Sequence, residues 1–506
     1  MVIKNKIVRD TGMLTVMLLL LDSAALLLNS FITRKTGASA MGILSLTGSF
    51  MVLAGTVSNG NAFLCTSRLI SEELGKKNGN PNRVLLNGLM LCTFLSVTVS
   101  MVLVGFSDTI GTKFFHSENI SRAIKLMPAA LIMSAFASCF KGYFNACRKS
   151  SVTAAADILD FAAKSAVIVI MTMSMKHSSE DSICGVMITG FASGSFISLV
   201  FMLIVFARSR QTFSGNYSLT FKKYISFALP IMGGGIITSA LSSTNDALIP
   251  VTLRQYGDSV SEAFSRFGIF EAIVIPTIFF PSVVLCSMSG IIVSESARAS
   301  ASGNKLRLKM LSEKLIGCTL VFAIFAAAML MRFGSVIGEL LGGGVLAGKM
   351  ITIIAPVVPF IYLEIILEAL IKGMGLQGFS SLNYLTEYAV RIAVVLIFIP
   401  RFGFYGIVAS YYASNIIGNT SRIVKILRHT GTKLNPLKNI LLPAAYSFMT
   451  LKAAELLSRP FGADEGKLSA NILLAAVWTA GYFIIFMLLK KGKKHESPLI
   501  CATSTK

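Results

Sequence analysis

Charged residues are scarce in this sequence. Lys, Arg, Asp and Glu make up 14% of its 506 residues, whereas about 25% is usual for a soluble globular protein. Hydrophobic residues make up 54%, and the mean hydropathy is +0.72. This composition excludes a soluble domain and predicts a polytopic protein whose partner is the lipid bilayer.

The residue patterns of enzymes and metal sites are also missing. The eight cysteines are scattered without a C-x-x-C pair, and the four histidines have no metal-ligand spacing. No H-E-x-x-H, G-x-S-x-G or Walker sequence occurs. The run from Gly373 to Gly378 matches a dinucleotide pattern, but it follows a membrane helix rather than a strand. We therefore expect no enzymatic activity, no metal and no bound cofactor.

Basic residues outnumber acidic ones, and the formal net charge is +22. Such a charge can indicate nucleic-acid binding, but here Lys and Arg form short clusters between apolar runs. This is how the orientation of a membrane protein is encoded, so no nucleic-acid partner is expected. The more basic connections include residues 65–83, 208–223 and 291–310. We predict that they face the cytoplasm together with both termini.

Apolar runs of about 20 residues or more can cross a hydrocarbon core of about 30 Å. They predict an all-α protein with fourteen transmembrane helices, at 12–33, 40–64, 84–106, 122–144, 151–176, 183–208, 222–245, 264–290, 311–333, 349–371, 381–400, 403–427, 437–457 and 468–490. Short amphipathic helices are predicted in the loops 65–83 and 291–310.

The sequence repeats itself loosely. Lys141-Gly142 is echoed by Lys372-Gly373, and Arg34 by Arg254, at an offset of roughly 220 to 230 residues. Self-similarity of this kind indicates tandem structural units. Because six is an even number of helices, both units have the same orientation in the membrane. An axis along the membrane normal then relates them, with a cavity between.

The repeat divides the chain into three parts. Residues 1–210 form a first lobe of six helices, and residues 211–430 form a second. Residues 431–506 add two helices and a basic tail without a counterpart in the repeat. The predicted fold class is thus two tandem six-helix lobes followed by a C-terminal helix pair.

Two pairs of opposite charges lie inside expected membrane helices, at matching places in the repeat. Asp160 and Lys164 are four residues apart, as are Glu387 and Arg391, so each pair can form on one helix face. A charge inside a membrane is costly and usually functional. Each pair is either structural or presents a cavity-facing base, Lys164 or Arg391, that exchanges its acid for an anionic substrate.

Three further charges are candidates. Asp22 shares a face of the first expected helix with Asn29, seven residues on. It is placed either to bind a coupling proton or Na⁺, or to hydrogen-bond to a neighbouring helix. Arg34 and Arg254 occupy repeat-equivalent outer positions, where each is either a substrate-binding base or an interfacial anchor.

Helix breakers are concentrated in the second half. Pro230 precedes Gly233–Gly235 in the seventh expected helix, and the eighth contains Pro276 and Pro281 as well as a lone acid, Glu271. In a membrane such breaks are tolerated only where neighbours or a cavity satisfy the freed backbone groups. They indicate either close packing on small residues or a flexible gate.

Several motifs, in chain order, resemble those of the multidrug/oligosaccharidyl-lipid/polysaccharide (MOP) exporter superfamily. Within it the chain is most similar to the stage V sporulation protein B and polysaccharide-biosynthesis branch, which is related to the lipid II flippases. The residues that carry the resemblance are Thr33–Gly37, Arg68–Glu72, Lys141–Tyr143, Leu248–Pro250 with Arg254, Ile291–Glu295 and Pro400–Ile407.

The resemblance implies a monomeric, V-shaped pair of lobes in the bacterial cytoplasmic membrane that opens alternately to each side. The implied cargo is a polyprenyl-diphosphate-linked sugar, a precursor of the cell wall or of a polysaccharide. Lipid II flippases carry several arginines on helices 1, 2 and 8. Here those helices offer only Arg34 and Arg266, so lipid II itself is not singled out.

Two other functions remain open at this stage. One is a cation-coupled multidrug exporter of the same superfamily, in which Asp22 would exchange a drug for an ion. The other is a scaffold in a cell-envelope complex that transports nothing. The sequence does not name the sugar, the coupling ion or a role in sporulation.

Overall fold

The computed structural model describes residues 2–76, 79–113, 121–174, 180–209, 221–432, 434–458 and 468–495. Within these ranges the chain is helical and contains no β-strand. Eleven helical segments of this described part are long and apolar enough to cross a membrane. The prediction of an all-α polytopic membrane protein is therefore confirmed.

The helices of the first half are separated by short connections. Their bounds are α1 (Val2–Thr36), α2 (Ala38–Asn59), α3 (Ala62–Leu74), α4 (Pro81–Gly105), α5 (Ser107–Lys113), α6 (Ser121–Ile124), α7 (Met127–Ala146), α8 (Ser150–Ser174) and α9 (Glu180–Ser209). The predicted loop helix at 65–83 corresponds to α3. It is set apart from α2 by a turn in which Gly60 and Asn61 both have positive φ.

The second half contains short π and 3₁₀ turns among its α-helices. The bounds are α10 (Phe221–Tyr256), α11 (Val260–Ile269), η2 (Phe270–Val274), α12 (Ile275–Phe279), η3 (Phe280–Ser282), α13 (Val283–Ala301), α14 (Lys305–Leu340), α15 (Gly344–Ile354), η4 (Ala355–Val357), α16 (Val358–Gly373), α17 (Gln377–Phe402) and α18 (Phe404–Thr430). The C-terminal elements are η5 (Leu437–Leu441), α19 (Leu442–Ser458) and α20 (Leu468–His495).

Every predicted span falls on helical residues. The eleven apolar segments do not confirm the predicted count of fourteen transmembrane helices. The runs at 122–144, 151–176 and 403–427 fall on α7, α8 and α18, which are not among the eleven apolar segments. A second predicted loop helix, at 291–310, is wrong. Here α13 continues to Ala301 and α14 begins at Lys305. No glycine or proline lies between residues 291 and 302, and the helix ends only before Gly303, whose φ is +65°.

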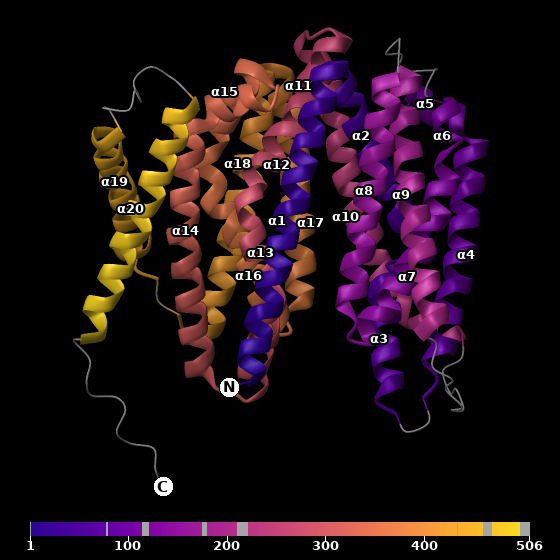
Figure 1. Cartoon of the computed structure of the whole chain (residues 1–506), viewed down its shortest axis with the longest axis horizontal. Coiled ribbons are helices and arrows are strands. Elements are labelled where there is room, and N and C mark those ends of the chain that lie inside the picture. The colour runs from indigo at the N-terminus through magenta and orange to yellow at the C-terminus, as the bar shows by residue number, and fades with distance from the viewer. Residues whose placement is uncertain are drawn as a thin grey trace.

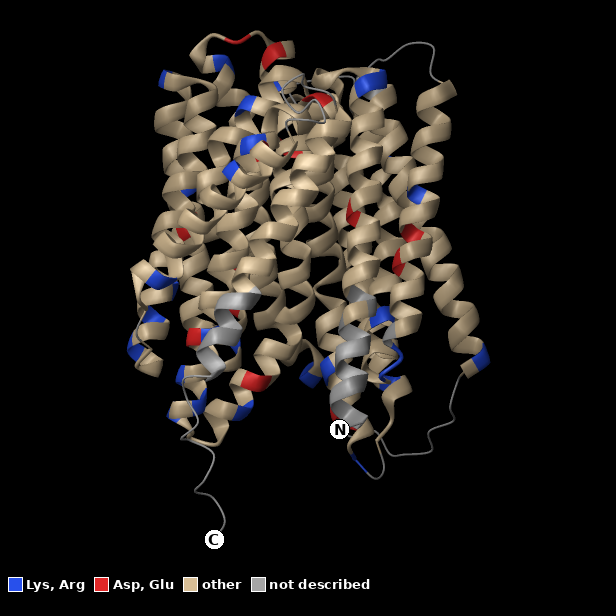
Figure 2. Ribbon diagram, turned by 60° about the vertical axis from the view of Figure 1, so that its left-hand side comes forward, with Lys and Arg blue, Asp and Glu red and all other residues tan. Residues whose placement is uncertain are grey.

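The long helices stand side by side in one bundle (Figure 1). We call the end at which the N-terminus lies the lower end and the opposite one the upper end, as they are drawn in Figure 1. Helices α4, α7 and α9 lie on one side, α14 to α18 lie on the other, and α19 and α20 are outermost, beside α14. Charged residues gather toward both ends and are sparse between them (Figure 2), as expected of a bundle that spans a membrane.

The repeated Lys-Gly pairs make equivalent contacts in the two halves. A Cβ atom on Gly142 of α7 would lie 2.7 Å from the backbone oxygen of Phe63 in α3. A Cβ atom on Gly373 of α16 would lie 2.6 Å from the backbone oxygen of Val293 in α13. Only glycine allows such close backbone approach. The repeat read from the sequence therefore has a structural counterpart at the lower end of each half.

Helix α10 is in contact with both halves. Near its lower end Tyr224, Ala228 and Met232 join the buried cluster of α3, α4 and α7, and the Tyr224 hydroxyl lies 3.1 Å from Thr66 Oγ1. Farther along, α10 packs on α17. It passes through Pro230 without a break. By sequence α10 belongs to the predicted second lobe, yet its lower end is buried in the first half.

The upper end brings the two halves into direct backbone contact. Helix α2 packs closely on α11. A Cβ atom on Gly42 would lie 2.0 Å from the Phe264 carbonyl oxygen, and one on Gly268 would lie 2.4 Å from the Gly42 nitrogen. No side chain fits between the two helices there. The halves are therefore closed against each other at the upper end.

Candidate functional site

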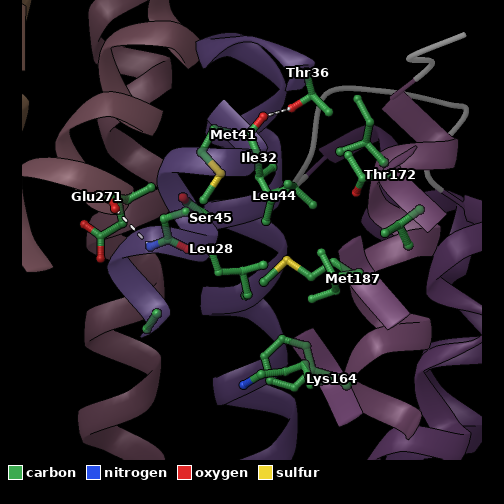
Figure 3. A pocket seen from close by; sticks show the side chains of 18 of the residues that line it. Leu28, Ile32, Thr36, Met41, Leu44, Ser45, Lys164, Thr172, Met187 and Glu271 are labelled. Atoms are coloured by element: carbon green, nitrogen blue, oxygen red, sulfur yellow. Dashed lines mark hydrogen bonds between the residues drawn. The ribbon is translucent and has the colours of Figure 1, made fainter. Parts of the chain in front are cut away.

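A first cavity lies among α1, α2, α8, α9 and the π turn η2. Its volume is about 260 Å³, and its polar lining residues are Asn29, Thr36, Ser45, Lys164, Thr172 and Glu271. Helix α1 is held against η2 by the side-chain amide of Asn29, which donates to the Ala272 carbonyl at 2.9 Å. Lys164 and Glu271 come from different halves of the chain and face the same space (Figure 3).

Lys164 is in direct ion-pair contact with no acid of the described residues, although Asp160 is near enough to interact with it electrostatically. Its Nζ lies 4.6 Å from the ring centroid of Phe191 and 5.5 Å from that of Phe161. Within the same part of the chain it forms no ion pair with Asp160, so the predicted i,i+4 pair is not formed. The reason is geometric, because the Lys164 side chain turns toward the aromatic rings while Asp160 packs against α9 at Gly194.

Glu271 occupies a local irregularity of the helix. It is the second residue of the π turn η2, a feature that often marks functional sites because the extra residue redirects side chains. In α10, Asp246 Oδ2 accepts a hydrogen bond from the Ser49 hydroxyl at 2.6 Å. Asp246, Glu271 and Arg391 are close enough to interact electrostatically. A group of charges from three helices thus lies behind the first cavity.

A second cavity of about 460 Å³ opens between α13, α16 and α17, toward the lower end. Its charged lining residues are Glu364, Glu368, Lys372, Glu387 and Arg391, together with Tyr384 and Tyr388. Three carboxylates, two bases and two phenols line this cavity alongside apolar side chains, so its wall carries more charge than that of the first cavity.

A fully buried arginine organises the acids of the second cavity. Arg422 of α18 has a side-chain exposure of 0% and lies 3.2 Å from Glu364, 3.2 Å from Glu368 and 3.1 Å from Glu387. Its guanidinium also stands 5.0 Å from the Tyr384 ring centroid. One cation therefore joins three carboxylates from α16 and α17, and it fixes these helices to α18.

The predicted Glu387–Arg391 pair is present, at 3.8 Å. Arg391 Nε also donates to the Ser414 hydroxyl at 3.1 Å, and its guanidinium lies 4.5 Å from the Tyr411 ring centroid. Glu387 is closer to Arg422 than to Arg391. Arg391 therefore holds its acid more loosely than the i,i+4 spacing alone suggests.

The remaining predicted site residues lie outside both cavities. Asp22 is exposed on α1, on the same face as the cavity-lining Ala25 and Asn29 but one turn closer to the lower end. Arg34 donates to the carbonyl of Leu340, at the C-terminal end of α14, where a cation is favoured by the helix dipole. Arg254 is exposed at the upper end of α10.

Two of the four predicted substrate-binding bases line a cavity, and the two cavities differ. Lys164 faces the first cavity and Arg391 the second. Glu271 connects them, because it lines the first cavity and interacts electrostatically with Arg391. Glu271 is therefore the residue of the first cavity that senses the charge of Arg391 in the second.

Sequence reasoning misses Asp246 and Arg422. The hydropathy pattern ends the seventh span at residue 245, whereas α10 continues to Tyr256, so Asp246 does not stand out as a membrane acid. Arg422 falls near the end of the predicted span 403–427, close to Lys425 and Arg428, and therefore looks like a base at the membrane surface, whereas it is buried inside α18. In the part of the chain that the structure describes, no group of three or more His, Cys, Asp or Glu is arranged to hold a metal ion.

No protein-family model matches this chain. A Bacillus subtilis (strain 168) protein, "Stage V sporulation protein B", is 20% identical over 490 residues, which cover 93% of each chain. Among solved structures, "Lipid II flippase MurJ, inward closed conformation" matches with a TM-score of 0.69 at 14% identity, over 95% of this chain and 99% of that one.

Multidrug transporters share the fold as well. An inward-facing MATE family transporter of the MOP superfamily matches with a TM-score of 0.67 at 14% identity, over 81% of this chain and 94% of that one. The MATE multidrug transporter DinF-BH matches with a TM-score of 0.63 at 16% identity, over 84% and 95%. The resemblance stated from the sequence is confirmed, and the fold is that of MOP superfamily transporters. The solved structures that share this fold are described as a flippase and as transporters, and these are not enzymes.

Proposed function

We propose that this chain, built on the MOP transporter fold, is an alternating-access flippase for a polyprenyl-diphosphate-linked sugar. It works as a monomer in the bacterial cytoplasmic membrane. The observation that carries the proposal is Lys164, a base within the bundle that lines a cavity and forms no ion pair within 4 Å with an acid of the described residues. Such a base is held ready for an anionic ligand, because aromatic faces stabilise a cation less than a phosphate does.

The chemistry of the cargo fits the division of the molecule into polar and apolar surfaces. A diphosphate entering the first cavity gains charge-assisted hydrogen bonds from Lys164. Arg391, loosely held by Glu387 at 3.8 Å, supplies a second base from the other cavity as the halves move. The sugar takes the polar wall of Tyr384 and Tyr388.

An apolar groove offers a place for the polyprenyl chain. It has a volume of about 510 Å³ and lies among α1, the α12–η3 region, α14 and α20. Phe322, Phe325, Phe333 and Phe483 are among its lining residues. Because its wall is almost wholly hydrocarbon and aromatic, a lipid tail can enter it without displacing polar groups.

The diphosphate role of Lys164 is tested by flipping assays in vesicles with defined lipid-linked sugars. Lys164→Ala is expected to lower transport by roughly ten- to a hundredfold, the value of a charged hydrogen bond, and Lys164→Arg is expected to keep most of it. Both variants should fold, because Lys164 forms no direct ion pair and Asp160 also interacts electrostatically with Lys141. Lys349→Ala is the matched control, since Lys349 also stands over an aromatic ring, Tyr405, at 5.4 Å. Unchanged transport in Lys164→Ala would refute the proposal.

Transport is coupled, in this proposal, to a proton or Na⁺ that binds Asp22. The side chain is exposed on the cavity-lining face of α1 and is free to bind an ion before the cargo enters. Asp22→Asn is expected to abolish transport driven by an ion gradient while the protein still folds and binds cargo. If gradient-driven transport persists in that variant, Asp22 is a packing residue and the buried acids Asp246 and Glu271 become the coupling groups to test.

The proposal includes fourteen transmembrane helices with both termini in the cytoplasm, supported by the more basic connections at the lower end. In a chain whose native cysteines are replaced, Gln255→Cys at the upper end and Gln377→Cys at the lower end are both exposed. A membrane-impermeant thiol reagent added outside the cell is expected to label the former only. Labelling of Gln377→Cys in intact cells would contradict this orientation.

A multidrug exporter is the second candidate, favoured by the wall of the second cavity. Three carboxylates and two phenols there suit an organic cation. Purified protein would then bind a cationic dye in competition with Na⁺ and ignore a polyprenyl-diphosphate sugar. The flippase predicts the reverse preference.

A further inference from the structure

A basic groove lies at the lower end of the molecule, away from both cavities. It has a volume of about 480 Å³ and is formed by Phe379 of α17 and the last turns of α18, from Thr420 to His429. Lys425, Arg428 and His429 line it, and no Asp or Glu of the described chain does. The groove therefore has the charge and the hydroxyl groups to bind a phosphate.

The cations of this groove are not neutralised by the protein. Within the residues that the structure describes, neither Lys425 nor Arg428 forms an ion pair. Other lower-end bases differ: Lys141 lies 2.7 Å from Asp157, and Arg307 lies 2.9 Å from Glu295. The dipole of α18 favours cations only in its last turn, so it does not account for Lys425, which stands five residues before the end of the helix at Thr430.

Lys425 is oriented over the groove by an aromatic ring. Its Nζ lies 5.3 Å from the ring centroid of Phe379. The same face of α18 continues toward the middle of the bundle as an apolar stripe, in which Ile417 is 46% and Val424 is 38% exposed. In a membrane protein such side chains contact lipid. The basic groove is therefore the polar end of a lipid-facing surface.

We propose that this groove binds an anionic phospholipid of the leaflet that meets the lower end. Lys425 and Arg428 bind the phosphodiester, the Ser421 hydroxyl donates to it, and one acyl chain lies along Val424 and Ile417. A zwitterionic lipid fits less well, because its amine meets two cations and no acid. Basic pockets at the membrane surface between helices recognise anionic head groups in this way.

The site has a structural consequence for the second cavity. Ser421 precedes Arg422 in the sequence, so a lipid that holds the lower turns of α18 also holds the helix that carries the buried arginine. Lipid binding and the geometry of the three carboxylates are therefore linked through one helix.

Native mass spectrometry of the full chain in neutral detergent tests this site. The protein is titrated with phosphatidylglycerol or with phosphatidylcholine of the same acyl chains. We expect one phosphatidylglycerol to bind more tightly than any phosphatidylcholine. In Lys425→Gln/Arg428→Gln its affinity should fall about thirtyfold, the contribution of two bases near a membrane surface. The control is Lys222→Gln/Lys223→Gln, two exposed bases at the lower end of α10, which should leave that affinity unchanged.

Two results would overturn the proposal. The first is an equal loss of phosphatidylglycerol in both double variants, which would show only a general effect of surface charge. The second is full competition by millimolar inorganic phosphate or soluble glycerophosphoglycerol, which would make the ligand a free anion rather than a lipid. Circular dichroism of each variant confirms that the helices are intact, so that a loss of binding is not a loss of folding.

Discussion

Replacement of Arg422 by Met is expected to destabilise the protein severely. The change would leave Glu364, Glu368 and Glu387 in a buried cluster without their shared cation. Removing one partner of a buried ion pair typically costs about 3–5 kcal/mol, a large share of a total stability of about 5–15 kcal/mol. Little folded protein should be recovered, and its thermal midpoint in detergent should fall by many degrees.

Two further variants keep this prediction open to refutation. Arg401→Met removes an exposed base from α17 and should leave the thermal midpoint unchanged. Adding Glu364→Gln and Glu368→Gln to Arg422→Met removes the acid whose ion pair is with Arg422 alone and one of the two most buried acids, and Glu387 keeps Arg391, so much of the folded protein should be restored. An Arg422→Met protein as stable as Arg401→Met would mean that water or protonation already neutralises the acids.

Replacement of Arg391 by Ala is expected to separate transport from folding. Glu387 keeps its contact with Arg422 at 3.1 Å, whereas Asp246 and Glu271 lose the cation with which they interact electrostatically, so the thermal midpoint should fall much less than in Arg422→Met. The cargo loses the charge-assisted hydrogen bond that Arg391 donates to it in the proposed mechanism. Transport should therefore fall by roughly ten- to a hundredfold. Flipping and thermal unfolding are measured on the same preparations.

The double variant Glu387→Ala/Arg391→Ala distinguishes a cargo-binding base from a structural pair. A structural pair predicts that both folding and transport recover in the double variant. A cargo-binding base predicts that the protein folds and transport stays lost. The matched control is Lys452→Ala/Glu455→Ala, which removes a comparable pair on α19, at 2.8 Å, away from both cavities. Recovery of transport in Glu387→Ala/Arg391→Ala would end the cargo-binding interpretation.

The architecture is predictable because it follows from length and hydrophobicity. An apolar run that crosses a bilayer must be helical, since no water is present to satisfy its backbone groups. The repeated glycines Gly142 and Gly373 have a common physical reason, since a side chain at either position would meet the backbone of a neighbouring helix.

The site is only partly predictable. Glu387 and Arg391 pair as their spacing indicates, but Lys164 with the same spacing does not pair with Asp160. Spacing places two side chains on one helix face, whereas the aromatic ring of Phe191 on α9 determines where Lys164 turns. Asp246 is missed because the seventh predicted span ends at residue 245, whereas α10 continues to Tyr256. Arg422 is missed because a buried base and a loop base look alike until the neighbouring helices supply their acids.

Helix α10 constrains how the molecule can change shape. At about 1.5 Å per residue, its 36 residues form a rod of roughly 54 Å, fixed at its lower end by Tyr224 and at its upper end by α17. Because α10 is fixed at both ends, a rotation of one half relative to the other would bend this helix. Pro230 and Pro250 both lie inside this helix and lack an amide hydrogen for the helix ladder, so the rod is weakest at these two points. In the proposed alternating-access cycle α10 would therefore bend at two prolines, and its segments between and beyond them would move as straight rods.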